Sequence, residues 1–413
     1  MNIFLVAVIA IILFDYLLHL VKDVLNIRKL NPDLPREFEG FYDEDSYKKS
    51  QQYLSQRTVF SLIEDAFLKS VTIIFILAGG FNAFDLFARS FKAGPIPTGM
   101  IFAAVVIAAF QFLNIPFSYY YTFVIEEKFG FNKTKRLTFF LDIAKSWFLG
   151  GVIAGVIYTL LIWFFRTAGN LAWAFCWIAV VLFQLFLTFI APVVILPIFN
   201  KFTPLTDGPL KKSIEDYANK ENFTIKGIYV MDGSRRSAKS NAFFTGFGKF
   251  KRIVLFDTLI SKHTTEELVS IIAHEMGHFK MRHIHKMLTA SILQTGFLFF
   301  LLSFFIKSPG LFSAFKMEHI SVYAGIIFFS FLYAPIQMFL SILSNFVSRK
   351  FEYQADSYTV KTFGNRPAFI CALRKLSSHN LSNLTPHKFK VFMDYTHPPV
   401  LERIKVISEA SGG

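Results

Sequence analysis

Seven long apolar stretches, separated by polar connections, dominate the sequence. Each has a length of about 20 residues, which an α-helix needs to cross the hydrocarbon core of a bilayer. The stretches occupy residues 2–20, 66–88, 99–123, 146–165, 171–196, 287–306 and 321–343. Hydrophobic residues make up 53% of the chain and charged residues only 17%, a balance more apolar than that of soluble domains. The pattern therefore predicts a mainly α-helical, polytopic membrane protein with seven transmembrane helices.

Two polar regions outside these stretches predict a small α+β domain. In the first region, short segments at 227–233, 239–246 and 252–256 are typical of strands. A helix then begins at Thr264, because Glu267 completes a capping-box pattern three residues later. The expected parts are residues 1–198 with helices one to five, 199–286 with the first part of the α+β domain, 287–344 with helices six and seven, and 345–413 with the second part of that domain.

The number of Lys and Arg residues alternates from one connection to the next. Residues 21–62 contain seven and residues 126–145 contain five, whereas the other short connections contain one or two. Because short cytoplasmic loops carry the excess of basic residues, we expect the N-terminus outside and both polar regions on the cytoplasmic side. This placement accounts for the net charge of +14 without nucleic acid, which we do not expect as a partner.

The stretch IIAHEMGHFKMRH brings titratable side chains to the helix that leads into the sixth apolar stretch. His274 and His278 are four residues apart, so on a helix both imidazoles project from one face and can bind a single Zn²⁺. Glu275 beside them can serve as a general base. Gly277 is expected to leave room beside the metal. We assign His283, just downstream, to the membrane interface.

A zinc site with an open position for water needs a third protein ligand. The chain has only two cysteines, so this ligand must come from a carboxylate or another histidine. NFVSRKFEYQAD, which follows the seventh apolar stretch, carries one polar stripe at helical spacing. It consists of Asn345, Ser348, Arg349, Glu352 and Asp356. An isolated stripe of this kind would be a solvated helix face, but beside H-E-x-x-H we expect Glu352 to be the third ligand. Asp356 is expected to accept the free N–H of a ligand histidine, and Asn345 to support the same site.

These features together resemble a known family. H-E-x-x-H, the distant N-x-x-S-R-x-x-E-x-x-A-D, a late His-Pro motif and seven apolar stretches are similar to the type I CAAX prenyl proteases, which are integral-membrane zinc endopeptidases. The resemblance extends over essentially the whole chain, including EEKFGFNKTK, LPIFNKFTPL and SNAFFTG. It implies one Zn²⁺ per chain on His274, His278 and Glu352. It also implies Glu275 as the catalytic base, and a ring of seven helices around a large chamber that the zinc domain closes at its cytoplasmic end.

Two further segments match motifs of this family. THPPVLER matches its His-Pro segment, which implies that His397 donates to the oxyanion formed on the scissile carbonyl. Arg403 at the end of the segment is implied as a support for the carboxylates of the zinc site. SNAFFTG matches the strand that lies beside the substrate, so Asn241 and Ala242 are expected to offer main-chain hydrogen bonds to an extended peptide.

The expected function is therefore zinc-dependent hydrolysis of peptide bonds near the C-terminus of proteins, with prenylated CAAX proteins as the expected substrates. One alternative is a quality-control zinc protease of membrane proteins without a prenyl requirement, although such proteases typically have four spans. Another is a transporter or receptor-like protein with a structural zinc site, for which Glu275 would have no use. We expect a monomer in the lipid bilayer. Because the C-terminal segment shows no di-lysine retrieval signal, a bacterial inner membrane is expected rather than the endoplasmic reticulum.

Overall fold

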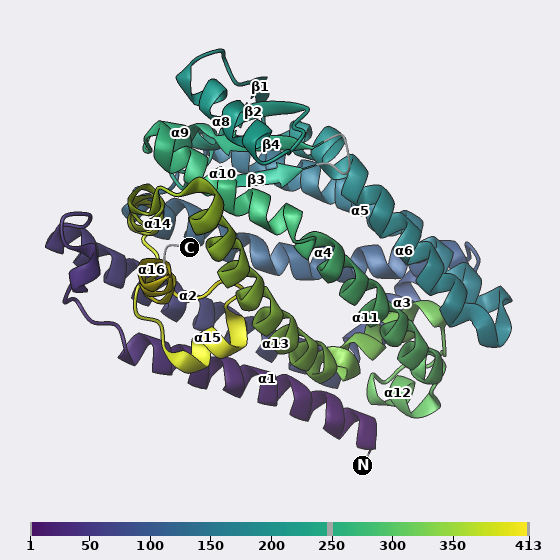
Figure 1. Ribbon diagram of the computed structural model, residues 1–413. Coiled ribbons are helices and arrows are strands. Elements are labelled where there is room, and N and C mark those ends of the chain that lie inside the picture. The colour runs from purple at the N-terminus through teal and green to yellow at the C-terminus, as the bar shows by residue number, and fades with distance from the viewer. Residues whose placement is uncertain (1, 246–250, 411–413) are drawn as a thin grey trace.

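The computed structural model describes residues 2–245 and 251–410, and the part that it describes is mainly α-helical (Figure 1). The long helices run side by side, and a small sheet lies at the end of the molecule opposite the N-terminus. The helices are α1 (Ile3–Arg28), α2 (Glu44–Leu77), α3 (Gly80–Ser90), α4 (Pro95–Tyr120), α5 (Arg136–Thr167), α6 (Ala172–Ile190), α7 (Leu196–Phe199), α8 (Pro209–Lys220), α9 (Asp257–Ile260), α10 (Thr265–Lys280), α11 (His283–Phe305), α12 (Pro309–Ala314), α13 (Val322–Phe363), α14 (Arg366–His379), α15 (Lys388–Asp394) and α16 (Val400–Glu409).

Within the described residues, six helices are long and apolar enough to cross a membrane. A seventh span results if α2 and α3 are counted as one bent element. The predicted second span at 66–88 is therefore broken, with an angle of 67° between its two helices. Each of the other six predicted spans lies, to within one residue at its ends, inside an unbroken helical segment of the structure.

The break between α2 and α3 lies at Gly79. This residue has a φ of +76°, a left-handed conformation that glycine adopts without the steric cost of a Cβ. The Lys316 ammonium donates a hydrogen bond to the carbonyl of Leu77, one of the last carbonyls of α2. A glycine and a cation from a distant loop thus end the helix, and hydropathy alone contains neither signal.

Helix α13 connects the membrane region to the α+β domain. It has 42 residues, so its length is about 63 Å at 1.5 Å per residue. This is roughly twice the ~30 Å thickness of a hydrocarbon core, so the C-terminal half projects beyond the apolar span, as predicted for the segment that carries Glu352. The projecting half packs against α10 from the other polar region (Figure 1).

A four-stranded sheet forms the β part of this domain. Its strands are β1 (Phe202–Pro204), β2 (Gly227–Met231), β3 (Ala242–Thr245) and β4 (Arg252–Phe256), in the order β1-β2-β4-β3. β2 and β4 are parallel, and the other two pairs are antiparallel. Strands were predicted at three of these places. β1 was not predicted because three residues ending in proline carry no periodic signal, and residue 246 of the predicted segment 239–246 lies outside the described residues.

Helix α10 begins with the predicted capping box, in which the Thr264 hydroxyl accepts from the Glu267 N–H while the Glu267 carboxylate accepts from the Thr264 N–H.

The face of α10 that carries Gly277 packs very closely on α13. A Cβ on Gly277 would lie 3.2 Å from the Cα of Ala355 and 3.1 Å from the Tyr358 ring. The absent side chain therefore makes room for α13, and the expectation that Gly277 leaves room beside a metal is wrong.

A second close approach gives a test of the membrane packing. A Cβ on Gly325 of α13 would lie 2.3 Å from the carbonyl oxygen of Ile306, whereas a Cβ on Gly151 of α5 would meet nothing within 4 Å. We expect Gly325→Ala to lower the melting temperature of the detergent-purified protein, because backbone must move.

Gly151→Ala is the matched control, since both changes bring the same helix-propensity gain of up to about 1 kcal/mol. It should leave the melting temperature unchanged or raise it. Equal melting temperatures for the two variants would contradict the packing described here.

Candidate metal centre

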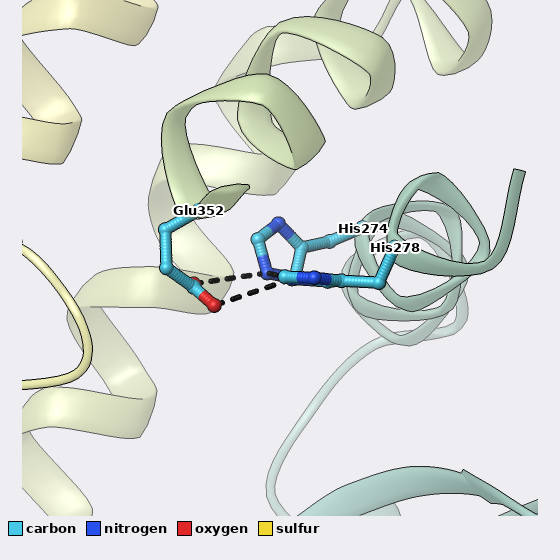
Figure 2. A group of neighbouring side chains, drawn as sticks. All are labelled: His274, His278 and Glu352. Atoms are coloured by element: carbon cyan, nitrogen blue, oxygen red, sulfur yellow. Dashed lines mark hydrogen bonds and ion pairs between the residues drawn. The ribbon is translucent and has the colours of Figure 1, made fainter. Parts of the chain in front are cut away.

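Helices α10 and α13 bring three potential metal ligands together (Figure 2). His274 and His278 lie one turn apart on α10, and their Nε2 atoms are 3.2 Å from each other. Glu352 of α13 faces both rings. Its Oε2 is 3.3 Å from His274 Nε2, and its Oε1 is 3.2 Å from His278 Nε2. One ligand atom from each of the three residues lies within 4.8 Å of the others.

The charges and hydrogen bonds of this group fit a bound cation. Glu352 Oε2 is buried and accepts no hydrogen bond from the described residues, which is costly for a carboxylate oxygen. Two imidazole nitrogens also face each other at hydrogen-bond distance. Although burial alone would lower the pKa of the His274 imidazole, the Asp356 and Glu352 carboxylates beside it raise that pKa to about 9. Two nitrogens and one carboxylate oxygen are a donor set typical of a metal site with an open position.

A chain of contacts orients His274. Its Nδ1 lies 2.9 Å from Asp356 Oδ1, so an N–H there donates to the carboxylate and leaves the Nε2 lone pair toward the ligand group. Arg403 from α16 then donates to both Asp356 oxygens, at 2.9 Å from Nε and 2.6 Å from Nη2. Its Nη1 is 3.6 Å from Glu352 Oε2. The guanidinium therefore balances two buried carboxylates and connects the last helix to the site.

A second chain orients His278, and the sequence reasoning missed it. His283 is only 3% exposed, and its Nδ1 lies 3.1 Å from His278 Nδ1. On its other side, His283 Nε2 lies 2.9 Å from the side-chain oxygen of Gln354. If His283 donates to Gln354, its Nδ1 accepts the proton of His278 Nδ1, and the His278 Nε2 lone pair again faces Glu352. The ring of His283 stacks on Phe351 at 4.0 Å.

The assignment of His283 to the membrane interface is therefore wrong. The residue begins α11 immediately after Arg282, whose left-handed φ of +57° turns the chain back toward α10. The signal available in the sequence was a third histidine five residues after the H-E-x-x-H pair. Helical spacing does not relate His283 to His274 and His278, because the turn at Arg282 lies between them.

Two further predicted catalytic groups are Glu275 on α10 and His397 near Glu352. Burial raises the pKa of the Glu275 carboxyl above its ordinary value, and the neighbouring Glu352 adds to this, although His274 and His278 oppose it. A carboxylate with a raised pKa holds a transferred proton more readily. His397 Nε2 lies 3.3 Å from Glu352 Oε1, and 62% of its side chain is exposed.

The segment that carries His397 is held by α13. Arg349 donates from Nη1 to the carbonyls of Val391 and Tyr395, at 3.0 and 2.6 Å. Asn345 donates to the carbonyl of Met393 at 2.7 Å. Asn345 thus contacts the backbone of α15 and none of the ligand side chains, so its expected support of the ligands themselves stays a prediction that this contact does not favour. The role of Arg349 was missed, because its partners are backbone atoms far along the chain.

Strand β3 lies at the free edge of the sheet. The N–H of Phe256 in β4 donates to the carbonyl of Asn241, so the main-chain groups of Asn241 point into the sheet. Since strand residues alternate in direction, Ala242 and Phe244 direct their main-chain groups to the free edge. The expectation that Asn241 offers its own main chain to a peptide is therefore wrong. Its side-chain oxygen instead accepts from the Ala242 N–H.

The fold and this site together define a membrane-embedded metallopeptidase. Residues 23–201 match the family model described as CAAX prenyl protease N-terminal, five membrane helices, and residues 204–411 match the model of peptidase family M48. The chain belongs to peptidase family M48. It is a membrane protease, and the expected alternative of a non-enzymatic transporter or receptor is excluded.

Relatives of known name cover nearly the whole chain. The CAAX prenyl protease 1 homolog of Oryza sativa subsp. japonica is 34% identical over 97% of this chain and 97% of its own length. CAAX prenyl protease 1 of Saccharomyces cerevisiae is 33% identical, over 92% and 89%. The crystal structure of S. mikatae Ste24p superposes with a TM-score of 0.93, covering 98% of this chain and 99% of that one at 30% identity. This similarity confirms the predicted fold class, a mainly α-helical polytopic membrane protein with a small α+β protease domain.

The contact between His278 and His283 can be tested by metal affinity. We expect His283→Ala to weaken metal binding by roughly 10- to 100-fold, because ligand histidines depend on the partner of their second nitrogen for tautomer and orientation. The measurement is competition with a chromogenic chelator on the purified protein.

The control for this variant is His319→Ala, which removes an exposed histidine outside the site. Its metal affinity should equal that of the unmodified protein. If His283→Ala also binds metal with unchanged affinity, the proposed orientation of His278 is wrong.

Proposed function

We propose that this protein is a zinc-dependent endopeptidase that removes the C-terminal residues of prenylated CAAX proteins. The observation that carries the proposal is the group of His274, His278 and Glu352 beside a spare carboxylate, Glu275, in a chain of this family. The printed names of the relatives, CAAX prenyl proteases, support the substrate class. A CAAX sequence ends in a cysteine followed by three residues, so its cleavage site lies close to a free C-terminus.

Zinc is the proposed metal, with one ion per chain. Two imidazoles and a single carboxylate suit Zn²⁺, whereas Mg²⁺ and Ca²⁺ prefer sites made of oxygen ligands. When bound, Zn²⁺ lowers the pKa of a coordinated water and polarises the scissile carbonyl. Asp356 and Arg403 hold the ligands in place through the contacts described above, so that little reorganisation is needed during the reaction.

The residues of the chain supply the proton transfers. Glu275 accepts a proton from the attacking water and then donates it to the nitrogen of the leaving amine. His397 donates a hydrogen bond to the oxyanion that develops on the scissile carbonyl, from the open side of Glu352. The free edge of β3 aligns the peptide by main-chain hydrogen bonds to the carbonyl of Ala242 and to Phe244, independently of the substrate side chains.

The proposed function also includes a membrane topology, an oligomeric state and a class of substrate. The basic connections support an N-terminus outside and a cytoplasmic protease domain and C-terminus. The protein acts as a monomer in the bilayer on peptide or protein substrates with a lipid group, without nucleic acid. The bacterial inner membrane stays a prediction, and the relatives named above, which come from a plant and a yeast, do not support it.

The catalytic role of Glu275 is tested by Glu275→Gln, with mass spectrometry of a farnesylated CAAX peptide as the assay. We expect kcat to fall by about 10²- to 10⁴-fold, the usual contribution of a general base, while the zinc content is retained. Glu266→Gln, which changes an exposed carboxylate on the same helix, should keep its activity. Full peptidase activity in Glu275→Gln would contradict the mechanism.

The substrate class is tested with the farnesylated peptide and its unprenylated twin. Wild-type protein should cleave the farnesylated peptide with the higher kcat/KM, and a chelator should abolish both reactions. Equal kcat/KM values would remove prenyl recognition and favour the alternative of a quality-control protease, which would still require the metal and Glu275.

The orientation is tested by labelling single cysteines. After replacement of Cys176 and Cys371 by alanine, a membrane-impermeant maleimide added to the cytoplasmic side should react with a Lys128→Cys variant but not with Lys92→Cys. The reverse pattern would show that the charge rule assigns the topology incorrectly in this protein.

A further inference from the structure

A cavity lies near the metal group, between the protease domain and α2. We call it the His397 cavity, and it has a volume of about 600 Å³. This is within the range of roughly 300–1,000 Å³ typical of ligand pockets. Its lining includes His397 and Arg403, which both contact Glu352, and also Arg57 of α2 and Lys239. The cavity is therefore accessible to a molecule that is bound at the catalytic group.

The wall formed by Arg57 and Lys239 carries an excess of positive charge. The Lys239 ammonium donates to Glu126 Oε1 at 3.1 Å and to the Tyr53 hydroxyl at 3.0 Å, and Tyr53 in turn donates to Glu126. Glu126 is buried, and its charge is balanced by Lys239. Arg57 forms no ion pair within 4 Å among the described residues, although it interacts with Tyr53 and, over a longer distance, with Glu126; it is exposed while lining the cavity. Two cations thus share one carboxylate, and one positive charge is left for a ligand.

The free edge of β3 leads a bound peptide toward this cavity. On the N-terminal side of β3, the side-chain amide of Asn380 occupies both main-chain groups of Ser240. Its oxygen accepts from the Ser240 N–H at 3.1 Å, and its nitrogen donates to the Ser240 carbonyl at 3.3 Å. The carbonyl of Lys239 accepts from the Thr258 hydroxyl. A peptide that pairs with Ala242 therefore cannot continue along the edge past Ser240, and its next residues must leave the sheet.

The direction of the peptide follows from what the cavity can hold. An antiparallel peptide places its C-terminal side next to the beginning of β3, where the cavity lies. Three residues extend over about 10 Å, so the three residues after a CAAX cysteine fit, whereas the folded body of a substrate protein does not. The negatively charged C-terminal carboxylate of such a peptide is complementary to the positive charge of Arg57 and Lys239 in the cavity wall.

We propose that Arg57, with Lys239 beside it, binds the C-terminal carboxylate of the substrate. The assignment rests on the proposed function, and it adds a chemical reason why cleavage occurs a few residues from the chain end. The planar guanidinium of Arg57 can donate two parallel hydrogen bonds to a carboxylate, and Lys239 contributes its charge while Glu126 holds it in place. A substrate of this site is therefore recognised at its free carboxylate as well as at its reacting bond.

The test compares two farnesylated CAAX peptides that differ only at the C-terminus, one a free acid and one an amide. With the zinc-loaded, full-length protein, we expect amidation to raise KM by about tenfold or more, because hydrogen bonds to a charged group contribute most to binding. The Arg57→Gln variant should show the increased KM for the free acid and discriminate between the two peptides less than about twofold.

Two further variants make the result specific. Arg57→Lys keeps the charge and should retain part of the preference for the free acid. Arg235→Gln removes an exposed guanidinium of the protease domain that does not line the cavity, and it should behave as the wild-type protein. Cleavage of the amide by Arg57→Gln reports that this variant is folded.

The outcomes separate this inference from the proposed function. Equal KM values for acid and amide in the wild-type protein overturn the carboxylate site but leave the peptidase intact. An unchanged preference in Arg57→Gln also overturns it. If zinc-loaded wild-type protein cleaves neither peptide, the proposed function fails, and the carboxylate site fails with it.

Discussion

The close packing of α10 on α13 is the contact on which the site depends. Gly277 and Ala355 allow the two helices to approach until the Glu352 oxygens are within about hydrogen-bond distance of both α10 imidazoles. A larger residue at Gly277 would separate the helices by the size of its side chain and would spread the ligands apart. Because α13 is also a membrane span, the bilayer and the ligand group share one rigid element, and the site is held at the membrane surface.

Buried charges in this region are tolerated because each is paired. Asp356 is 1% exposed and Glu352 is 3% exposed, and Arg403 lies against both. An unpaired carboxylate at this depth would be strongly destabilising, so the contact with Arg403 is a condition for having two acidic groups beside the histidines. The same rule applies around Glu126, where Lys239 and two tyrosine hydroxyls surround a single carboxylate. Arg57 nearby is exposed and lines the His397 cavity, so the rule for buried charges does not require it to have an ion-pair partner.

Much of the fold and the inner part of the site could be predicted from the sequence. The spans follow from hydropathy, and His274, His278 and Glu352 follow from helical spacing and the chemistry of zinc ligands. The features that were missed depend on contacts between segments far apart in the chain. The helix break at Gly79 involves Lys316, and the orientation of His278 involves His283 across a turn. Which main-chain groups of β3 are free depends on its register with β4, which no local pattern contains.

The sequence by itself determined most of the membrane spans, three of the four strands, the helix that follows Thr264 and the identity of the residues that can bind a metal, because these depend on local periodicity and side-chain chemistry. The tertiary structure alone decided which polar groups meet. It placed His283 behind a ligand, directed Arg349 to the backbone that precedes His397, and opened the cavity lined by Arg57 and His397. Such pairings depend on the distance and angle between packed helices, and these are set by the fit of many side chains together, which a single sequence does not express in any local pattern.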